Sequence, residues 1–304
     1  MKGAIELHNL SRILEGRSNL YVLDLSWHLY RSYFAFKNLY VDVEGFHRPT
    51  GNIYGVEKAI DSILSSDPEA CIILAQDGYP KRRIELLGES YKAGRAEREW
   101  DFNVDNNLIQ AITCSIPNVF WAYGVEQESD DLMYALSREA MRVPTFVGKV
   151  YLYTGDNDLL QAINDRVFVV RKFDNGHFDV IDRSRVIHDD VFVKKFHGVD
   201  PEHIVEFRAI VGDSSDNIRG IPRFPRDVAY TIAMGLLIIT EKQEKWYEVY
   251  NQNKDLIDRN RQVMKLSEDI DYNVTCRKVN REGLDRRMAE LSIKPFLFEK
   301  YGRR

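Results

Sequence analysis

Acidic side chains gather at the ends of apolar runs, and carboxylates placed in this way could hold metal ions. The carboxylates are those of Asp24, Asp77, Glu128, Asp130, Asp131, Asp156, Asp158, Asp213 and Asp216. Two carboxylates about 4 Å apart repel by roughly 4 kcal/mol at an effective dielectric constant near 20. If folding brings them together, they need cations, and ligand sets made only of oxygen suit hard ions such as Mg²⁺ or Mn²⁺.

Short apolar runs precede these side chains and predict the strands that position them. The runs cover residues 20–25, 71–76, 118–123, 149–154 and 166–171, with amphipathic stretches at 51–66, 100–115 and 129–142. This alternation predicts an α/β fold, with a mostly parallel sheet and helices on both faces. Ligands of such sheets bind beyond the carboxyl ends of the strands, where Asp24, Asp77 and the Asp156/Asp158 pair fall.

Each acidic group also has a simpler interpretation. Asp156 and Asp158 follow Thr-Gly before an apolar stretch, and Asp is a favoured helix N-cap. Acidic residues are also favoured in the first turn of a helix, which would account for Asp130 and Asp131. Capping and metal binding are equally good explanations of each of these two groups alone, whereas Asp213 and Asp216 alone would be explained as turn residues. Five groups at one edge of one sheet favour metal binding.

Composition and charge restrict the class of protein. The chain has 304 residues, 44% of them hydrophobic, and a formal net charge of −5. It contains no GxSxG, P-loop, CxxC or HExxH motif, and no apolar stretch long enough for a signal peptide or a membrane span. Three scattered cysteines are typical of a reducing cytoplasm, which we expect as the location. Basic residues around the acidic groups would attract a phosphate backbone.

The pattern changes near residue 185, which predicts two parts. Residues 1–185 would form the α/β core, including a polar, basic segment at 78–99 that we expect to be mobile above the strand ends. Residues 186–304 would form a helical region. Its expected helical segments are 189–197, 201–211, 226–239, 243–267 and 284–301.

In chain order, these motifs resemble the 5′–3′ exonuclease domain of bacterial DNA polymerase I and the phage flap endonucleases. The first half carries LDLSWHLYRSYFA (23–35), PTGNIYGV (49–56) and QDGYPKRRIELLGESYKAGR (76–95). The acidic set is completed by GVEQESDD, TGDNDLLQ and GDSSDNIRGIP, and NRQVMKLSEDI (260–270) resembles a later helix and strand. The resemblance spans about residues 18–300. It implies a PIN-like 5′ nuclease fold with a helix–three-turn–helix at about 205–240.

The resemblance also implies a role for each site residue. Asp24, Asp77 and Glu128 would hold a first divalent ion, with Asp130 shared between two ions. The second ion would be surrounded by Asp131, Asp156, Asp158, Asp213 and Asp216. Lys92 and Arg95, on the 78–99 arch, would act on the scissile phosphate. The DNA contacts would come from Arg31, Arg82, Arg83, Tyr91, Arg219, Arg223 and Arg226.

The implied protein is a monomeric flap endonuclease and 5′–3′ exonuclease that uses two Mg²⁺ ions, for which Mn²⁺ would substitute. Its substrate would be DNA with a 5′ flap, a nick or a single-stranded 5′ end, or an RNA–DNA primer duplex. Replication proteins are candidate partners, and no membrane is expected. The implied location is the cytoplasm of a bacterial cell or of a phage-infected host. Two alternatives stay open: a ribonuclease H-like nuclease acting on hybrids, and a module that binds DNA junctions without cutting them.

The chain departs from the family pattern in three places. Gln-Glu-Ser precedes the double Asp of the first acidic motif, so Glu128 rather than Glu126 takes the place of the family's glutamate. Ile84 stands where the family has an arginine eight residues before Lys92, and Arg82 or Arg83 would substitute for it. GIPRFPRD (220–227) replaces the family's Gly-Val-Pro-Gly-Val-Gly-x-Lys, so that Arg223 and Pro225 stand in place of two glycines. Those glycines let backbone N–H groups approach a phosphate or a bound K⁺. Their loss counts against a K⁺ site, and Arg223 and Arg226 would contact phosphate instead.

Overall fold

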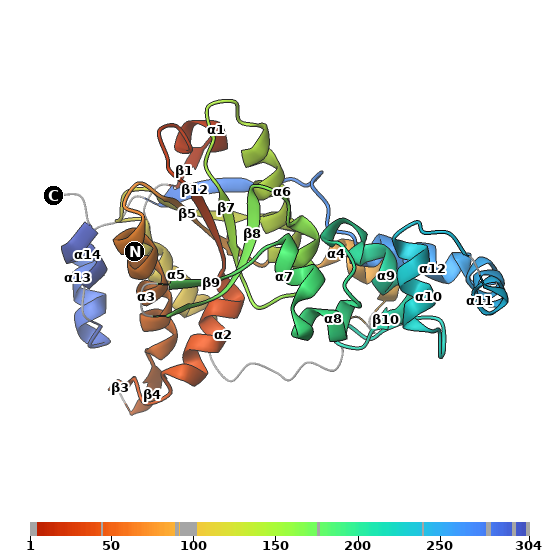
Figure 1. Cartoon of the computed structure of the whole chain (residues 1–304). Coiled ribbons are helices and arrows are strands. Elements are labelled where there is room, and N and C mark those ends of the chain that lie inside the picture. Colours follow the sequence, from red (N-terminus) through yellow and green to blue (C-terminus); the bar gives the residue numbers. More distant parts are fainter. Residues whose placement is uncertain are drawn as a thin grey trace.

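The computed structural model describes residues 5–43, 45–88, 91, 102–174, 177–238, 240–277, 281–293 and 296–301. Figure 1 shows a central sheet between helices, and a helical region that extends from one side of it. Lys92, Arg95 and much of the 78–99 arch lie outside the described residues. The mobility of the arch therefore stays a prediction.

One sheet forms the centre of the α/β part, and eight strands belong to it among the described residues. In spatial order they are β1 (Ile5–His8), β12 (Asn273–Arg277), β6 (Val119–Tyr123), β5 (Cys71–Gln76), β2 (Leu20–Asp24), β7 (Val150–Tyr153), β8 (Val167–Asp174) and β9 (His177–Ile181). The five strands from β6 to β8 run parallel, whereas the strands at both edges run antiparallel. The predicted mostly parallel sheet is confirmed.

The central strand β2 shows how the sheet divides the core into two layers. All five of its residues are buried, as its unbroken apolar run predicts for a parallel strand covered on both faces. Leu20 and Val22 join one apolar cluster, while Tyr21 and Leu23 join the other, because successive side chains point to opposite faces. The predicted helices on both faces are therefore also confirmed.

Different helices cover the two faces (Figure 1). The face of Tyr21 and Leu23 is covered by α2 (Leu25–Ala35), α3 (Gly51–Ser66), α5 (Phe102–Thr113), α13 (Arg281–Glu290) and α14 (Phe296–Tyr301). The opposite face is covered by α1 (Leu10–Ile13), α6 (Ser129–Arg142) and the 3₁₀ helix η2 (Asp158–Ala162). A hairpin of β3 (Tyr40–Val43) and β4 (Phe46–Pro49) connects α2 to α3.

The helical region follows β9, the antiparallel strand at one edge of the sheet. It contains α7 (Arg183–His188), α8 (Asp190–Phe196), η3 (Pro201–His203), α9 (Ile204–Val211), α10 (Arg226–Ala233), α11 (Glu241–Gln252) and α12 (Lys254–Met264). Between α9 and α10, a small ladder pairs β10 (Gly212–Asp213) with β11 (Ile218–Arg219). Helix α12 packs on α9 and on α4 (Lys81–Leu87), so it joins the helical region to the start of the arch segment. None of the helices in the described ranges has the length and hydrophobicity needed to span a bilayer.

Several elements differ from those expected from the sequence. Strands β1, β3, β4, β9 and β12 were not predicted, and β12 brings the chain back from the helical region into the core sheet. The segment 243–267 was expected as one helix, but it divides into α11 and α12 at Asn253, and the expected helix at 284–301 divides into α13 and α14. The division of the chain near residue 185 stays a prediction.

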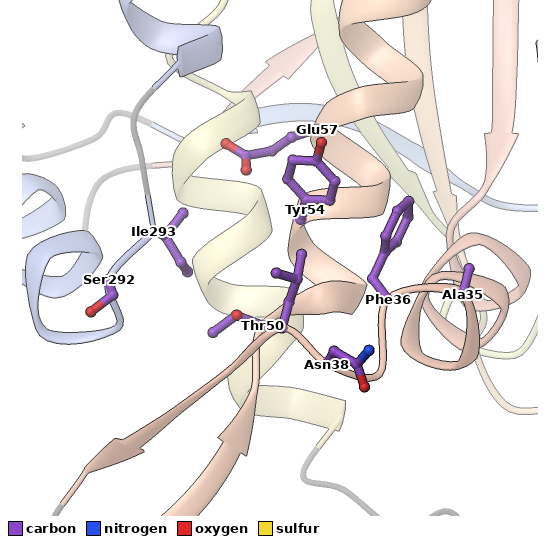
Figure 2. Close-up of a pocket in the computed structure, with 9 residues that line it drawn as sticks. Ala35, Phe36, Asn38, Thr50, Tyr54, Glu57, Ser292 and Ile293 are labelled. Atoms are coloured by element: carbon purple, nitrogen blue, oxygen red, sulfur yellow. The ribbon is translucent and has the colours of Figure 1, made fainter.

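A mostly apolar pocket of about 750 Å³ lies between α2, α3 and the residues after α13 (Figure 2). It is lined by Ala35, Phe36, Asn38, Leu39, Thr50, Tyr54, Glu57, Ser292 and Ile293. Glu57 is only 2% exposed, and its Oε1 atom has no hydrogen-bond partner among the described residues. Burial raises the pKa of Glu57 to about 8.

Candidate active site

Asp24 lies at the point where β2 passes into α2. Its carboxylate caps α2 by accepting a hydrogen bond from the Trp27 backbone N–H at 3.1 Å. Thr154, at the end of the neighbouring strand β7, donates its hydroxyl to the same carboxylate at 2.9 Å. Burial, and then the nearby charge of Asp77, raise the pKa of Asp24 to about 7 despite these two hydrogen bonds.

Asp77 and the first turn of α6 bring the next carboxylates to the same edge of the sheet. Asp77 follows β5 and accepts a hydrogen bond from the Ser129 backbone N–H at 2.8 Å. This contact holds the start of α6, where Asp130 is buried. Burial, and then the charges of Asp156 and Asp24, raise the pKa of Asp130 well above its usual range. A bound cation would relieve this repulsion.

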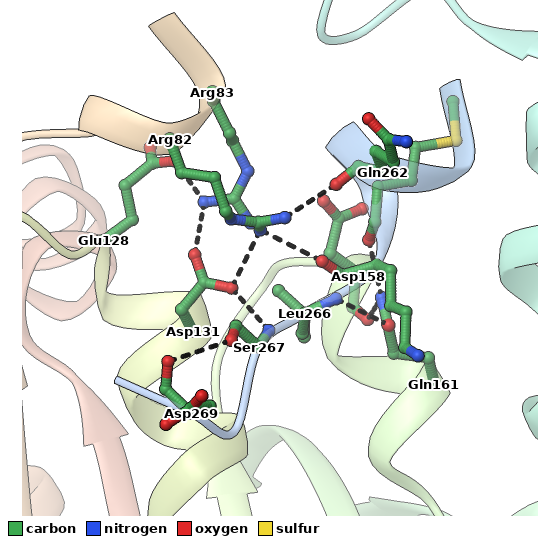
Figure 3. A network of polar contacts seen from close by, with 12 residues as sticks. Arg82, Arg83, Glu128, Asp131, Asp158, Gln161, Gln262, Leu266, Ser267 and Asp269 are labelled. Carbon is green, nitrogen blue, oxygen red and sulfur yellow. Dashed lines mark hydrogen bonds and ion pairs between the residues drawn. The ribbon is translucent and has the colours of Figure 1, made fainter. Parts of the chain in front are cut away.

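Two arginines of α4 bind carboxylates of this edge (Figure 3). Arg83 is 4% exposed and bridges Glu128 and Asp131, with its Nη1 atom 2.7 Å from Asp131 Oδ2. Arg82 donates to Asp131 Oδ1 at 3.1 Å and to the backbone carbonyl of Gln262 in α12 at 2.6 Å. These arginines bind the acidic residues, and Arg82 also joins α4 to α12. Their contact with DNA stays a prediction.

Two more contacts complete this network. The Ser267 backbone N–H donates to Asp131 Oδ1 at 2.8 Å. The half-buried Tyr91 donates its hydroxyl to Glu128 Oε2 at 2.9 Å. Asp131 was assigned to the second ion, but the structure joins it to Glu128 through Arg83. Tyr91, which was predicted to contact DNA, therefore binds the Glu128 carboxylate in this structure.

A second cluster forms where η2 meets the loop after α9. Asp158, Asp213 and Asp216 each place a carboxylate oxygen within 4.8 Å of the other two. In the described part of the chain, no other set of three acidic side chains comes this close together. Asp156 lies next to them, and its carboxylate accepts the Asp158 backbone N–H at 2.8 Å. A set of three carboxylates at this spacing fits a divalent cation, because such ions prefer several oxygen ligands.

Arg208 lies inside this second cluster and was missed by the sequence interpretation. It is 4% exposed, and its two terminal nitrogens donate to Asp158 and Asp213. Although burial opposes the shift, Arg208 and Ser215 lower the pKa of Asp213. The one sequence signal is a cation within the apolar run of α9, IVEFRAIV, where a residue facing solvent is the usual explanation.

The other residues predicted to contact DNA lie on the surface. Arg31, Arg219 and Arg223 are exposed, and the guanidinium of Arg31 lies 5.0 Å from the centre of the Trp27 ring. Arg226, also exposed, donates to the Lys195 carbonyl and lies 5.0 Å from the Phe207 ring centre. Arg226 thus has protein partners, whereas the charge of Arg223 points away from the core.

A sequence profile of the "5'-3' exonuclease, N-terminal resolvase-like domain" matches residues 19–196, which is more than half of the chain. The chain belongs to the 5′–3′ exonuclease family. The resemblance to this family is therefore confirmed, over the residues that carry the acidic motifs from Asp24 to Asp158.

Three relatives show how far the similarity extends. A protein of Aquifex aeolicus named 5'-3' exonuclease is 27% identical over 289 residues, covering 92% of this chain and 94% of the relative. The thermostable DNA polymerase I of Thermus thermophilus is 30% identical over 211 residues, covering 69% of this chain and 23% of the polymerase. The bacteriophage T5 D15 flap endonuclease, solved with DNA and metal ions, has a TM-score of 0.55 at 19% identity, covering 82% and 89% of the two chains. The structural match confirms the 5′ nuclease fold.

The loop before α10 contains a backbone conformation that is typical of glycine. Arg223, where the resemblance in sequence predicts a glycine, has φ of +58°, which non-glycine residues seldom adopt. Next to it, the buried ring of Phe224 packs edge-on against Trp246 at 5.3 Å. Pro225 then caps α10 with φ of −65°. Phe224 thus fixes the turn, and the turn holds the Arg223 backbone in a conformation that would suit glycine better.

Proposed function

We propose that this member of the 5′–3′ exonuclease family hydrolyses phosphodiesters of DNA, as a metal-dependent flap endonuclease and 5′–3′ exonuclease. The observation that carries the proposal is the gathering of buried carboxylates at one sheet edge. Asp24 and Asp130 repel each other there, and Asp158 lies with Asp213 and Asp216. Such an edge lowers its own energy by binding divalent cations.

The carboxylates divide between two expected Mg²⁺ sites, in which Mn²⁺ would substitute. Asp24, Asp77, Glu128 and Asp130 would hold the first ion, and the second would lie among Asp156, Asp158, Asp213 and Asp216, with Asp131 between the sites. Two ions of this kind stabilise the attacking and leaving oxygens of a phosphate and make water a nucleophile near neutral pH.

The rest of the site orients these ligands. Thr154 and the Trp27 N–H hold Asp24, and the Ser129 N–H holds Asp77. Arg83 holds Glu128 and Asp131 in fixed positions. Carboxylates held in this way need little rearrangement when they bind an ion, and such preorganisation would raise the rate of phosphodiester hydrolysis. Lys92 and Arg95, outside the described residues, would stabilise charge on the phosphate.

The DNA would be recognised by its shape and its phosphates. Arg31, Arg219, Arg223 and Arg226 are exposed cations on α2 and around the α9–α10 loop. Contacts of this kind position a duplex without reading its sequence. The T5 flap endonuclease complex with DNA supports DNA as the partner. A duplex bearing a 5′ flap, a nick or a free 5′ end would place its scissile phosphate between the acidic edge and the arch.

The experiment that tests the proposal is a comparison of substrates under single-turnover conditions. The protein is mixed with 5′-flap DNA, nicked duplex, blunt duplex or an RNA-primed duplex, each labelled at the 5′ end, with Mg²⁺ or with EDTA. We expect Mg²⁺-dependent release of the flap by a cut near its base, and little cleavage of the blunt duplex. Exclusive cleavage of the RNA strand would instead identify a hybrid ribonuclease, and binding without any cleavage would identify a junction-binding module.

A further inference from the structure

Arg208 is a buried cation inside the second acidic cluster. It comes from the middle of α9, while Asp158 comes from η2 at the end of the core sheet and Asp213 from β10. Its ion pair with Asp158 therefore joins the helical region to the α/β core, whereas its ion pair with Asp213 lies within the helical region. With 4% exposure, it is shielded from solvent and from dissolved ions, so its charge is poorly screened.

The hydrogen bonds around Asp213 already use both of its carboxylate oxygens. Oδ2 accepts from Arg208, and Oδ1 accepts the Ser215 backbone N–H at 2.7 Å. Asp158 gives one oxygen to Arg208 as well. A divalent ion bound to these carboxylates would therefore share them with a guanidinium, or displace it.

The formal charges of the cluster show how Arg208 affects the binding of a divalent ion. The three carboxylates carry a formal charge of −3, and Arg208, which stays protonated in proteins, reduces it to −2. One divalent cation then neutralises the cluster completely. Without Arg208, the three carboxylates and one divalent ion would keep a net charge of −1. The ion would also no longer be repelled by a buried guanidinium beside it.

We propose that Arg208 is a permanent cation of the second acidic cluster that weakens the binding of a free divalent ion there. The inference rests on the proposed metal-dependent function. It has two consequences. The cluster can stay folded without metal, because Arg208 already compensates part of its charge. The ion at this cluster binds more tightly once a DNA phosphate adds its negative charge, so that metal loading is coupled to substrate binding.

The test is Mn²⁺ binding without DNA, measured by electron paramagnetic resonance of the free ion, for the wild type and two variants. Arg208→Gln keeps a hydrogen-bond donor but removes the charge, and Arg208→Lys keeps the charge. Of the two Mn²⁺ ions, we expect the more weakly bound one to bind at least tenfold more tightly to Arg208→Gln than to the wild type. Its dissociation constant in Arg208→Lys should stay within threefold of the wild-type value. Unchanged or weaker Mn²⁺ binding by Arg208→Gln would overturn the proposal.

Arg261→Gln is the matched control. Arg261 binds Glu206, another residue of α9, at 2.7 Å, so its loss loosens the same helix without changing the charge of the cluster. Its Mn²⁺ affinity should equal that of the wild type, and a tenfold gain there would attribute the effect to helix mobility instead. If Arg208→Gln does not fold without metal, it is titrated with Mn²⁺. Refolding below the Mn²⁺ concentration that saturates the wild type supports the proposal, and failure to refold at any concentration contradicts it.

The failure of this inference can be told from that of the proposed function, because Mn²⁺ binding is measured without any substrate. A wild type that cuts flap DNA, together with unchanged Mn²⁺ affinity in Arg208→Gln, rejects the role of Arg208 alone. A wild type that cuts nothing, together with the tenfold gain, rejects the nuclease function and keeps the role of Arg208.

Discussion

Replacing Glu57 by glutamine removes a buried carboxyl from the pocket of Figure 2 without changing the shape of the side chain. In the folded protein, the pKa of Glu57 is raised by burial from 4.5 to about 8. A carboxyl with a raised pKa contributes its stability below pH 4.5, where it is protonated in both states. This stability is lost as the pH rises towards 8, because only the unfolded chain ionises freely.

The size of the effect follows from that difference in pKa. One pKa unit corresponds to about 1.4 kcal/mol, so at pH 8 the wild type loses at most about 4 kcal/mol relative to acidic pH. Relaxation and water entry reduce such penalties, and we expect roughly 2 kcal/mol. Glu57→Gln should therefore unfold with nearly the same free energy as the wild type at pH 5, and with roughly 2 kcal/mol more at pH 8.

The assay is urea unfolding at pH 5, 6, 7 and 8, read as the difference between the variant and the wild type at each pH. Taking the difference cancels the contributions of the other titrating groups. Asp61→Asn, on the same helix α3, is the matched control. Although burial opposes the shift, Lys300 and Tyr301 lower the pKa of Asp61. Its carboxyl is therefore ionised in both the folded and the unfolded chain above pH 5, so the difference in stability between this variant and the wild type should stay constant from pH 5 to pH 8. Parallel curves for Glu57→Gln and the wild type would refute the reasoning.

Three further variants test the loop before α10 and the arginine network. Arg223→Gly should raise the free energy of unfolding by about 1 kcal/mol, since φ of +58° suits glycine, and should weaken flap binding at low salt; a loss of stability would contradict the strain. Arg83→Met should lower stability in EDTA by roughly 3 kcal/mol, because two buried carboxylates lose their shared cation. Mg²⁺ should restore more stability to that variant than it adds to the wild type, and an equal melting-temperature gain would argue against a metal near Glu128. Phe224→Ala should cost roughly 3 kcal/mol and weaken duplex binding, while Mn²⁺ binding stays unchanged; lost Mn²⁺ binding would show that the turn also supports the acidic cluster.

The parts of the fold with strong local patterns were predictable from the sequence. Strands β2, β5 and β7 are unbroken apolar runs, so their ends, and the carboxylates Asp24 and Asp77, could be placed at one sheet edge. Strands β1 and β12 were missed because they are antiparallel and mixed in polarity, and β12 pairs with a strand about 150 residues earlier in the chain.

The cations of the site were harder to predict than its anions. Arg83 was expected to contact DNA and Arg208 was overlooked, since arginine is seldom fully buried. Their burial depends on carboxylates from other elements: Arg83 meets Glu128 across 45 residues of sequence, and Arg208 meets Asp158 across 50. Local patterns cannot reveal such pairs, because the fold creates them.

The most direct measurement is single-turnover cleavage of 5′-flap DNA in Mg²⁺ by the wild type and by Asp130→Asn, with flap binding measured in EDTA for both. Asp130 is buried among Asp24, Asp156 and Asp158, so the amide removes one charge from the middle of the acidic edge while it keeps the shape of the side chain. We predict that the wild type cuts the flap and that Asp130→Asn binds it without cutting. A wild type that binds the flap but leaves it intact, or an Asp130→Asn variant that cuts at the wild-type rate, would contradict a metal-dependent nuclease site at this edge.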